Sequence, residues 1–171
     1  MNRIVPRQPV PDLEVQMTAG GMWRLADQKP PVFTMIAFYR GLHCPICKVY
    51  LKELEGKLDE FAKRGVEVIA ISSDSAERAR QAQREWGLPR LKIGYGLATE
   101  RARQWGLFIS RAIKDTEPDE FAEPGIFLVK PDGTLYCASI QTMPFARPSF
   151  DPILGAIAFI VANNYPARGE A

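Results

Sequence analysis

The 171-residue sequence contains one histidine and three cysteines, and its basic and acidic side chains nearly cancel. A zinc site with four ligands would therefore have to use all of its histidine and cysteine at once. The formal charge of +2 comes from 22 lysines and arginines against 20 acidic residues, so the composition gives no reason to expect a nucleic-acid partner. No cofactor is expected either, because we find neither a dinucleotide fingerprint nor a phosphate-binding loop.

Long apolar segments are also missing. The longest nearly apolar stretches, residues 32–39 and 153–162, fall far short of the roughly 20 residues that a bilayer-spanning helix needs. No apolar segment follows Met1–Arg7, so we expect no secretory signal, no membrane partner and a cytoplasmic location. The apolar share of 46% and the charged share of 25% exclude a disordered chain, a collagen-like chain and a disulfide-dense mini-scaffold.

The length predicts a single domain over residues 1–171, in which residues 1–20 form a proline-rich, irregular segment. Strands and helices are expected to alternate along the rest. The expected strands cover residues 22–25, 32–39, 66–71, 91–93, 126–130 and 135–140, and the expected helices cover residues 44–64, 76–86, 99–105 and 152–163. This alternation predicts an α/β fold with a mixed central β-sheet and helices on both of its faces. We expect residues 108–123 to be a charged connection.

The last expected helix, residues 152–163, is apolar on almost all sides. A helix of this kind either packs deeply against the sheet or contributes part of its surface to a subunit interface. A homodimer is therefore one of the expected partners.

Two cysteines lie three residues apart where the strand at residues 32–39 leads into the next helix. Cys44 is expected at the N-cap, Pro45 at the first helical position and Cys47 in the first turn. Unpaired backbone N–H groups and the positive end of the helix dipole then face the sulfurs and stabilise a thiolate, which is the reactive form of cysteine. The spacing also lets the two sulfurs form a disulfide with each other.

Other interpretations of this pair remain open. The two cysteines could be small buried hydrophobic residues, or they could form a cramped zinc site with His43 and Cys137. Redox chemistry explains the position of the pair better. His43 could lower the pKa of Cys44 as a cation, accept its proton, or be an exposed loop residue. Cys137 is expected to pack inside a buried strand, or to act as a distant resolving cysteine if the fold brings it close to the pair.

Several short motifs follow one another in a fixed order. They are Pro11-Asp12-Leu13, Phe38-Tyr39 through Cys47, Val68 through Asp74, Trp86 through Pro89, Gln104 through Leu107, and Glu123 through Gly133. In this order they resemble the peroxiredoxin-like redoxins of the AhpC/TSA group, from about Pro11 to about Pro166. The resemblance implies a thioredoxin fold with a peroxiredoxin-like layout.

The active-site loop departs from the peroxiredoxin pattern Pro-x-x-x-Thr-x-x-Cys, because these positions hold Arg40, Cys44 and Cys47. By the resemblance, Cys47 matches the peroxidatic cysteine, and Cys44 matches the first cysteine of a thioredoxin Cys-x-x-Cys. Arg147 matches the arginine that lies against the peroxidatic sulfur, where a guanidinium would keep a thiolate ionised. On the residues alone, Arg147 could also be a surface arginine.

The resemblance also implies a substrate-binding set around the thiols. Pro124 matches a cis-proline that presents its backbone to the active site. Tyr39, Arg40 and His43 come from the active-site strand and loop. Arg40 could serve the same purpose as Arg147, or it could be a solvated loop residue.

The sequence therefore predicts a thiol-dependent antioxidant oxidoreductase that reduces peroxides, with Cys47 attacking and Cys44 resolving. A thioredoxin- or glutathione-type reductant would restore the dithiol. One alternative is a thioredoxin-like protein disulfide oxidoreductase in which Cys44 attacks a disulfide substrate. A second alternative is a redox-fold binding protein without catalytic turnover.

Overall fold

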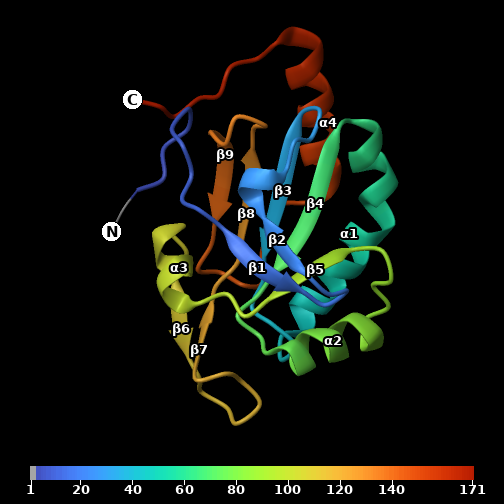
Figure 1. Ribbon diagram of the computed structural model, residues 1–171, viewed down its shortest axis with the longest axis vertical. Helices are drawn as coiled ribbons and strands as arrows, with labels where there is room; N and C mark the ends of the chain where they lie inside the picture. Colours follow the sequence, from blue (N-terminus) through green and yellow to red (C-terminus); the bar gives the residue numbers. More distant parts are fainter. Residues whose placement is uncertain (1–2) are drawn as a thin grey trace.

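A computed structural model describes residues 3–171 of the chain and shows one large sheet with helices on both faces (Figure 1). The sheet has the strand order β2-β1-β5-β4-β3-β8-β9. Its strands are β1 (Glu14–Met17), β2 (Met22–Arg24), β3 (Phe33–Phe38), β4 (Val66–Ile71), β5 (Lys92–Tyr95), β8 (Gly125–Val129) and β9 (Leu135–Ile140). The pairs β3–β4 and β4–β5 are parallel, and the other neighbours are antiparallel. The predicted mixed sheet is confirmed.

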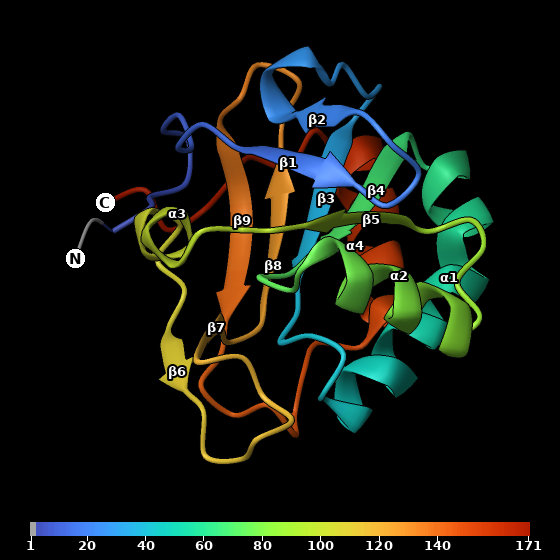
Figure 2. The same cartoon turned by 60° about the horizontal axis from the view of Figure 1, so that its bottom comes forward.

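Besides this sheet, residues 3–171 form four α-helices and a short 3-10 turn. The helices are α1 (Pro45–Lys63), α2 (Ala76–Glu85), α3 (Thr99–Gln104) and α4 (Phe150–Asn163), and the turn is η1 (Leu25–Asp27). Figure 2 shows α1, α2 and α4 on one side of the sheet and α3 on the other. Each side encloses its own hydrophobic cluster, because the side chains of β3 and β4 alternate between the two faces. Within residues 3–171, no helix combines the length and the apolar character needed to cross a membrane.

Three short strands differ from the sequence prediction. Strand β1 lies inside the segment 1–20 that was expected to be irregular, and its Val15 side chain packs into the core between exposed Glu14 and Gln16. The expected charged connection contains β6 (Ile109–Arg111) and β7 (Glu120–Ala122), which pair in a separate two-stranded sheet. Each of these three strands has only three or four residues and at most two buried side chains, which is too few to produce a clear hydrophobic pattern.

The structure also corrects the expected burial of Cys137. This side chain is exposed, because β9 is the edge strand of the sheet. Neighbouring protein atoms still shield its sulfur in part from water, and this desolvation raises the pKa of the Cys137 thiol to about 11. An exposed thiol with a raised pKa reacts slowly, so nothing here gives Cys137 a part in catalysis.

Candidate active site

The two neighbouring cysteines lie where the central strand β3 ends and α1 begins. All six side chains of β3 are buried, which fixes the point where the chain leaves the sheet. Cys44 is the N-cap of α1, and its Sγ accepts a hydrogen bond of 3.2 Å from the backbone N–H of Cys47. Pro45 is the first helical residue, as predicted. The predicted position of both sulfurs at the start of this helix is confirmed.

An arginine from a distant part of the chain contacts both sulfurs. The Nη2 atom of Arg147 lies 3.1 Å from Cys47 Sγ and 3.5 Å from Cys44 Sγ. The Nε atom of the same side chain donates to the carbonyl oxygen of Pro144 at 3.1 Å, which fixes the direction of the guanidinium. Both cysteines are unpaired and buried, so the positive charge faces them in a site with little water.

These contacts ionise the two thiols unequally. The pKa of Cys44 falls to about 5, because its sulfur accepts hydrogen bonds from the side chain and backbone of Cys47 and faces Arg147. The pKa of Cys47 rises well above its ordinary value, chiefly because this sulfur is desolvated and lies beside the ionised Cys44. Near neutral pH the pair therefore carries a single negative charge beside Arg147, and the directions of the two pKa shifts favour Cys44 as its site.

Tyr50 holds the arginine in place, a role that the sequence did not suggest. The guanidinium of Arg147 lies 5.5 Å from the centroid of the Tyr50 ring. The Tyr50 hydroxyl donates to the carbonyl oxygen of Pro148 at 2.6 Å, and the ring stacks on Phe150 at 4.4 Å between centroids. This ring is one of the apolar side chains that repeat along α1, and that pattern gives no sign of a polar partner across the fold.

Two predicted site residues, Arg40 and His43, interact with the β6–β7 hairpin. Arg40 Nε lies 3.3 Å from a carboxylate oxygen of Glu123, and its guanidinium covers the ring of Phe121 at 4.9 Å. The His43 ring also packs on Phe121, with 4.6 Å between centroids. Burial and the nearby Arg40 lower the pKa of His43, so its ring is neutral near neutral pH. His43 therefore does not lower the pKa of Cys44 as a cation.

Tyr39 and Pro124 are both buried, and each lies one residue outside a central strand. Tyr39 follows β3, and burial raises the pKa of its hydroxyl far above the ordinary value. Pro124 precedes β8, and its carbonyl oxygen accepts from the backbone N–H of Gln141 at 3.0 Å. The expected cis bond before Pro124 is not observed, since all peptide bonds of the described residues are trans. Trans is also the more stable form of an ordinary bond before proline.

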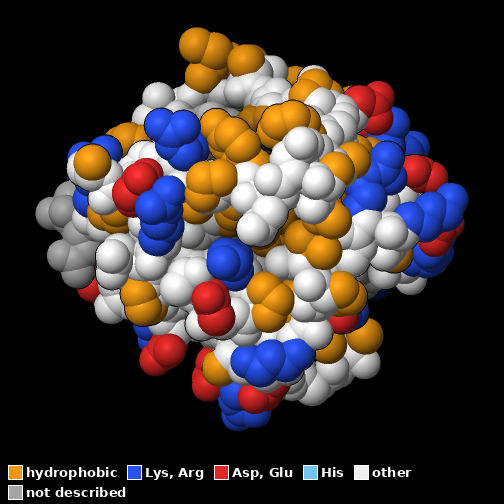
Figure 3. Space-filling view, turned by 90° about the horizontal axis from the view of Figure 1, so that it is seen from above, with side chains coloured by type: hydrophobic (Ala, Val, Ile, Leu, Met, Phe, Trp, Pro, Cys, Tyr) orange, Lys and Arg blue, Asp and Glu red, His pale blue; other side chains and the backbone are white. Residues whose placement is uncertain are grey.

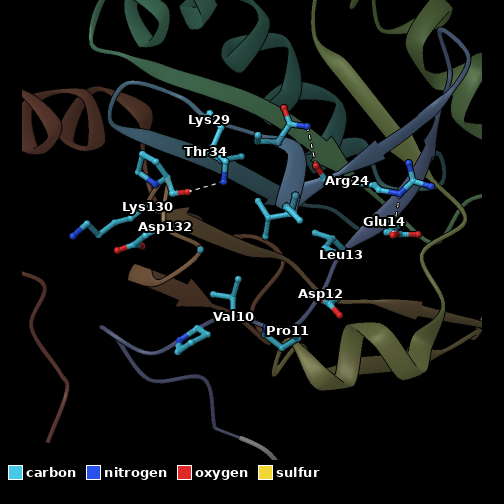
Figure 4. Close-up of a pocket in the computed structure, with 16 residues that line it drawn as sticks. Val10, Pro11, Asp12, Leu13, Glu14, Arg24, Lys29, Thr34, Lys130 and Asp132 are labelled. Carbon is cyan, nitrogen blue, oxygen red and sulfur yellow. Dashed lines mark hydrogen bonds and ion pairs between the residues drawn. The ribbon is translucent and has the colours of Figure 1, made fainter.

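The structure contains a cavity of about 400 Å³ away from the sulfurs, beside β1, η1 and the β8–β9 turn (Figure 4). Basic and acidic side chains line it together, and neither Cys44 nor Cys47 does. In the part of the chain from residue 3 onward, no group of three or more histidine, cysteine, aspartate or glutamate side chains is arranged to hold a metal ion.

The fold and the site together define a class: a thioredoxin-fold protein with a thiol pair at the start of a helix. Comparison with known proteins identifies the family within this class. The model of the AhpC/TSA family matches residues 6–137. The chain belongs to this family.

Curated relatives and solved structures agree with this assignment. The chain is 29% identical over 133 residues to "1-Cys peroxiredoxin B" of Oryza sativa, a match that covers 72% of this chain and 58% of that protein. It is 27% identical over 117 residues to "1-Cys peroxiredoxin" of Medicago truncatula, covering 65% of this chain and 50% of that one. The matches thus span only 50–58% of the length of these relatives.

Two solved structures illustrate the shared fold. Peroxidoxin BcpB from Mycobacterium tuberculosis superposes with a TM-score of 0.75 at 16% identity, covering 92% of this chain and 99% of that one. The reduced 2-Cys peroxiredoxin of Plasmodium vivax gives a TM-score of 0.78 at 15% identity, covering 95% of this chain and 84% of that one. At such low identity these matches establish the thioredoxin fold.

Proposed function

We propose that this protein is a thiol-dependent peroxidase, an antioxidant enzyme whose Cys44/Cys47 pair cycles between dithiol and disulfide. The observation that carries the proposal is the guanidinium of Arg147, which contacts both sulfurs at the N-terminus of α1. A fixed cation there stabilises a thiolate and can donate a hydrogen bond to a peroxide oxygen. Membership of the AhpC/TSA family supports the same chemistry.

The proposed cycle has three steps that balance. A thiolate attacks one oxygen of a hydroperoxide; the O–O bond breaks, the sulfur becomes a sulfenic acid, and the leaving oxygen takes up a proton to give an alcohol or water. The neighbouring thiol then attacks the sulfenic sulfur, forming the Cys44–Cys47 disulfide and releasing water. An external dithiol finally supplies two electrons and two protons through thiol–disulfide exchange.

The resemblance to peroxiredoxins assigns the first attack to Cys47, whereas the ionisation of the pair favours Cys44. The low pKa of Cys44 supplies the charged nucleophile. The charge on Cys44 helps to raise the pKa of Cys47, so conversion of Cys44 to a neutral sulfenic acid lets Cys47 lose its proton beside Arg147 and attack as a thiolate. We therefore propose Cys44 as the attacking residue and Cys47 as the resolving residue. The order expected from the resemblance is the alternative outcome of the experiment below.

A sulfenic-acid probe distinguishes the two orders. Each single variant, Cys44→Ser and Cys47→Ser, is treated with one equivalent of hydrogen peroxide and labelled with dimedone. We expect Cys47→Ser to accumulate a labelled sulfenic acid on Cys44, and Cys44→Ser to react slowly. Labelling of Cys47 alone would restore the order given by the resemblance, and labelling of neither residue would refute the peroxidase function.

A second candidate function is protein disulfide reduction, favoured by the acidic Cys44 of a Cys-x-x-Cys sequence. In this case Cys44 attacks a disulfide of a partner protein, and Cys47 resolves the mixed disulfide. Side-by-side assays of peroxide consumption and insulin-disulfide reduction with the same thiol donor compare the two functions. Turnover of insulin alone would favour the second one.

Exposed apolar side chains on the segments that carry the site favour a protein as the reductant. Ile46 and Val49 lie on the first turns of α1, and Met143 and Phe145 lie on the loop that holds Arg147. Glutathione carries two carboxylates and an amine, for which these side chains offer no charged partner. We therefore prefer a thioredoxin-type protein to glutathione. A cytoplasmic location, where such reductants keep thiols reduced, is part of the same proposal.

A homodimer through α4 is a further part of the proposal. Phe150, Leu154 and Ile157 pack this helix on the sheet, while Phe159 and Val161 are more than half exposed. Figure 3 views the molecule from the top of Figure 1 and shows several hydrophobic side chains at the surface of that end. Sedimentation velocity checks the proposal, because Phe159→Glu should shift a dimer towards the monomer. A wild-type monomer at all concentrations would contradict it.

A further inference from the structure

A buried carboxylate in the turn between β4 and α2 lies against the loop that leads to Cys44. Asp74 closes the Ser72-Ser73-Asp74 sequence, and its side chain has no exposed surface. Its backbone is fixed from both sides, because the Asp74 N–H donates to Ser72 Oγ at 3.2 Å and the Asp74 carbonyl accepts from the Gly96 N–H at 2.8 Å. A carboxylate held this firmly can serve as a fixed support for a neighbouring segment.

The carboxylate contacts the active-site loop directly. Its Oδ2 atom accepts from the backbone N–H of Leu42 at 2.8 Å. The loop passes so close that a Cβ atom at Gly41 would lie 2.7 Å from Asp74 Oδ1, and Gly41 also has a φ of +136°, which favours glycine. The carbonyl oxygen of Gly41 in turn accepts from the Cys44 N–H at 3.1 Å. Two hydrogen bonds thus connect Asp74 to the residue that bears the acidic thiol.

Arg78 holds the same carboxylate from the other side. Its Nε atom donates to Asp74 Oδ1 at 3.1 Å, and its Nη2 atom donates to the carbonyl oxygen of Thr116 at 3.1 Å in the turn between β6 and β7. The arginine lies in the first turn of α2, whose N-cap Ser75 accepts from the Arg78 N–H. Asp74 therefore has a charged partner on a rigid helix, which compensates for burying its carboxylate.

We propose that Asp74, held by Arg78, is a positioning residue that keeps the loop at Gly41 and Leu42 in the conformation that presents Cys44 as the N-cap of α1. The carboxylate fixes the loop backbone, the loop orients Cys44, and the sulfur then receives the Cys47 N–H and the Arg147 guanidinium. The proposal rests on the proposed function only in taking Cys44 as the reactive thiol, and its test does not depend on peroxide.

The test measures the rate of thiol alkylation by iodoacetamide against pH in the folded protein. All variants carry Cys47→Ser, so that Cys44 is the one thiol of the pair that can react. Mass spectrometry distinguishes alkylation of Cys44 from alkylation of Cys137. Removing the support with Asp74→Ala should raise the midpoint of the Cys44 profile by about one pH unit, because the sulfur loses part of its hydrogen bonding. Asp74→Asn keeps an oxygen that can accept from Leu42, so it should recover at least half of that shift. Asp59→Ala, which removes an exposed partner of Arg90, is the matched control and should leave the midpoint unchanged.

A second variant keeps the test decisive if Asp74→Ala does not fold. Gly41→Ala pushes the loop away from the same carboxylate from the opposite side, and it should raise the midpoint in the same direction. A folded Asp74→Ala or Gly41→Ala protein with the parent midpoint would overturn the proposal. Peroxide consumption by the wild-type protein, measured separately, tests the proposed function, so a failure of one can be told from a failure of the other.

Discussion

Replacing Arg147 by glutamine removes the positive charge that faces both sulfurs while keeping a polar side chain. The Nη2 atom of Arg147 donates to Cys47 Sγ at 3.1 Å and to Cys44 Sγ at 3.5 Å. A hydrogen bond to a charged group contributes about 1.5–3 kcal/mol. One pKa unit corresponds to about 1.4 kcal/mol, so the loss should raise the pKa of Cys44 by about 1–2 units. Starting from about 5, the pKa would reach about 6–7.

The sign follows from the form of the thiol that the arginine favours. A cation stabilises the thiolate, so its removal shifts the titration of Cys44 to higher pH, and reactivity is lost first on the acid side. With a pKa of about 7, the thiolate fraction at pH 6 falls from about nine tenths to about one tenth. At pH 8.5 Cys44 is largely ionised in both proteins, and the variant should alkylate at least as fast as the wild type, because a thiolate of higher pKa is the stronger nucleophile.

The assay is the rate of iodoacetamide alkylation against pH, supported by thiolate absorbance at 240 nm. Arg90→Gln, which changes an exposed arginine paired with Asp59, is the control for the loss of one positive charge. If Arg147→Gln and the wild-type protein share one pH profile, the electrostatic explanation of the acidic thiol is refuted. A uniform loss of rate at every pH would also refute it, since it would indicate a change of access and not of ionisation.

Three further outcomes are expected. Phe145→Asp should lower kcat/KM with a protein dithiol by about tenfold, or about 1.4 kcal/mol, and leave turnover with dithiothreitol unchanged, as expected if Phe145 is one of the few contact residues that contribute most of the binding energy. Met22→Asp, an exposed apolar position on β2, is the control. Tyr50→Phe should lower the Tm by about 2–4 °C, because it removes the 2.6 Å hydrogen bond to Pro148, worth about 1 kcal/mol; an unchanged Tm in calorimetry would count against this anchor. Phe61→Ala, at a fully buried position, should cost about 3–5 kcal/mol in urea unfolding, and a loss below about 1 kcal/mol would mean that the core is not packed as described.

The elements that the sequence predicted well are those with strong local signals. Strand β4 was expected at residues 66–71 and is found there, because an apolar run of this length is long enough to stand out. Helix α1 was expected to begin after Cys44 and to end near Gly65, where the φ of +74° suits glycine. Capping residues act through hydrogen bonds to their own neighbours, so they can be recognised without knowledge of the fold.

The parts that escaped prediction depend on contacts between distant segments. Arg40 and Arg147 were both possible partners of the thiols, and Arg40 is much nearer to them along the chain. The fold pairs Arg40 with Glu123 and brings Arg147 onto the sulfurs from 100 residues away. Glu123 and Asp74 stood within recognised motifs, but their roles depend on which backbone or side chain lies opposite them. A sequence pattern carries no such information.

The contacts that make Cys44 acidic also influence the second half of the proposed cycle. The Arg147 guanidinium and the start of α1 stabilise a charged sulfur, and in a disulfide both sulfurs are neutral, so most of this stabilisation is lost on oxidation. The reduced pair is thereby favoured over the disulfide, which makes the couple more oxidising and its disulfide easier to reduce. A low thiol pKa also makes Cys44 the better leaving group when an incoming thiolate attacks Cys47. The arrangement that prepares Cys44 for attack on a peroxide therefore also favours reduction of the Cys44–Cys47 disulfide by a thiol reductant. A catalytic pair needs such an easily reduced disulfide, whereas a structural disulfide does not.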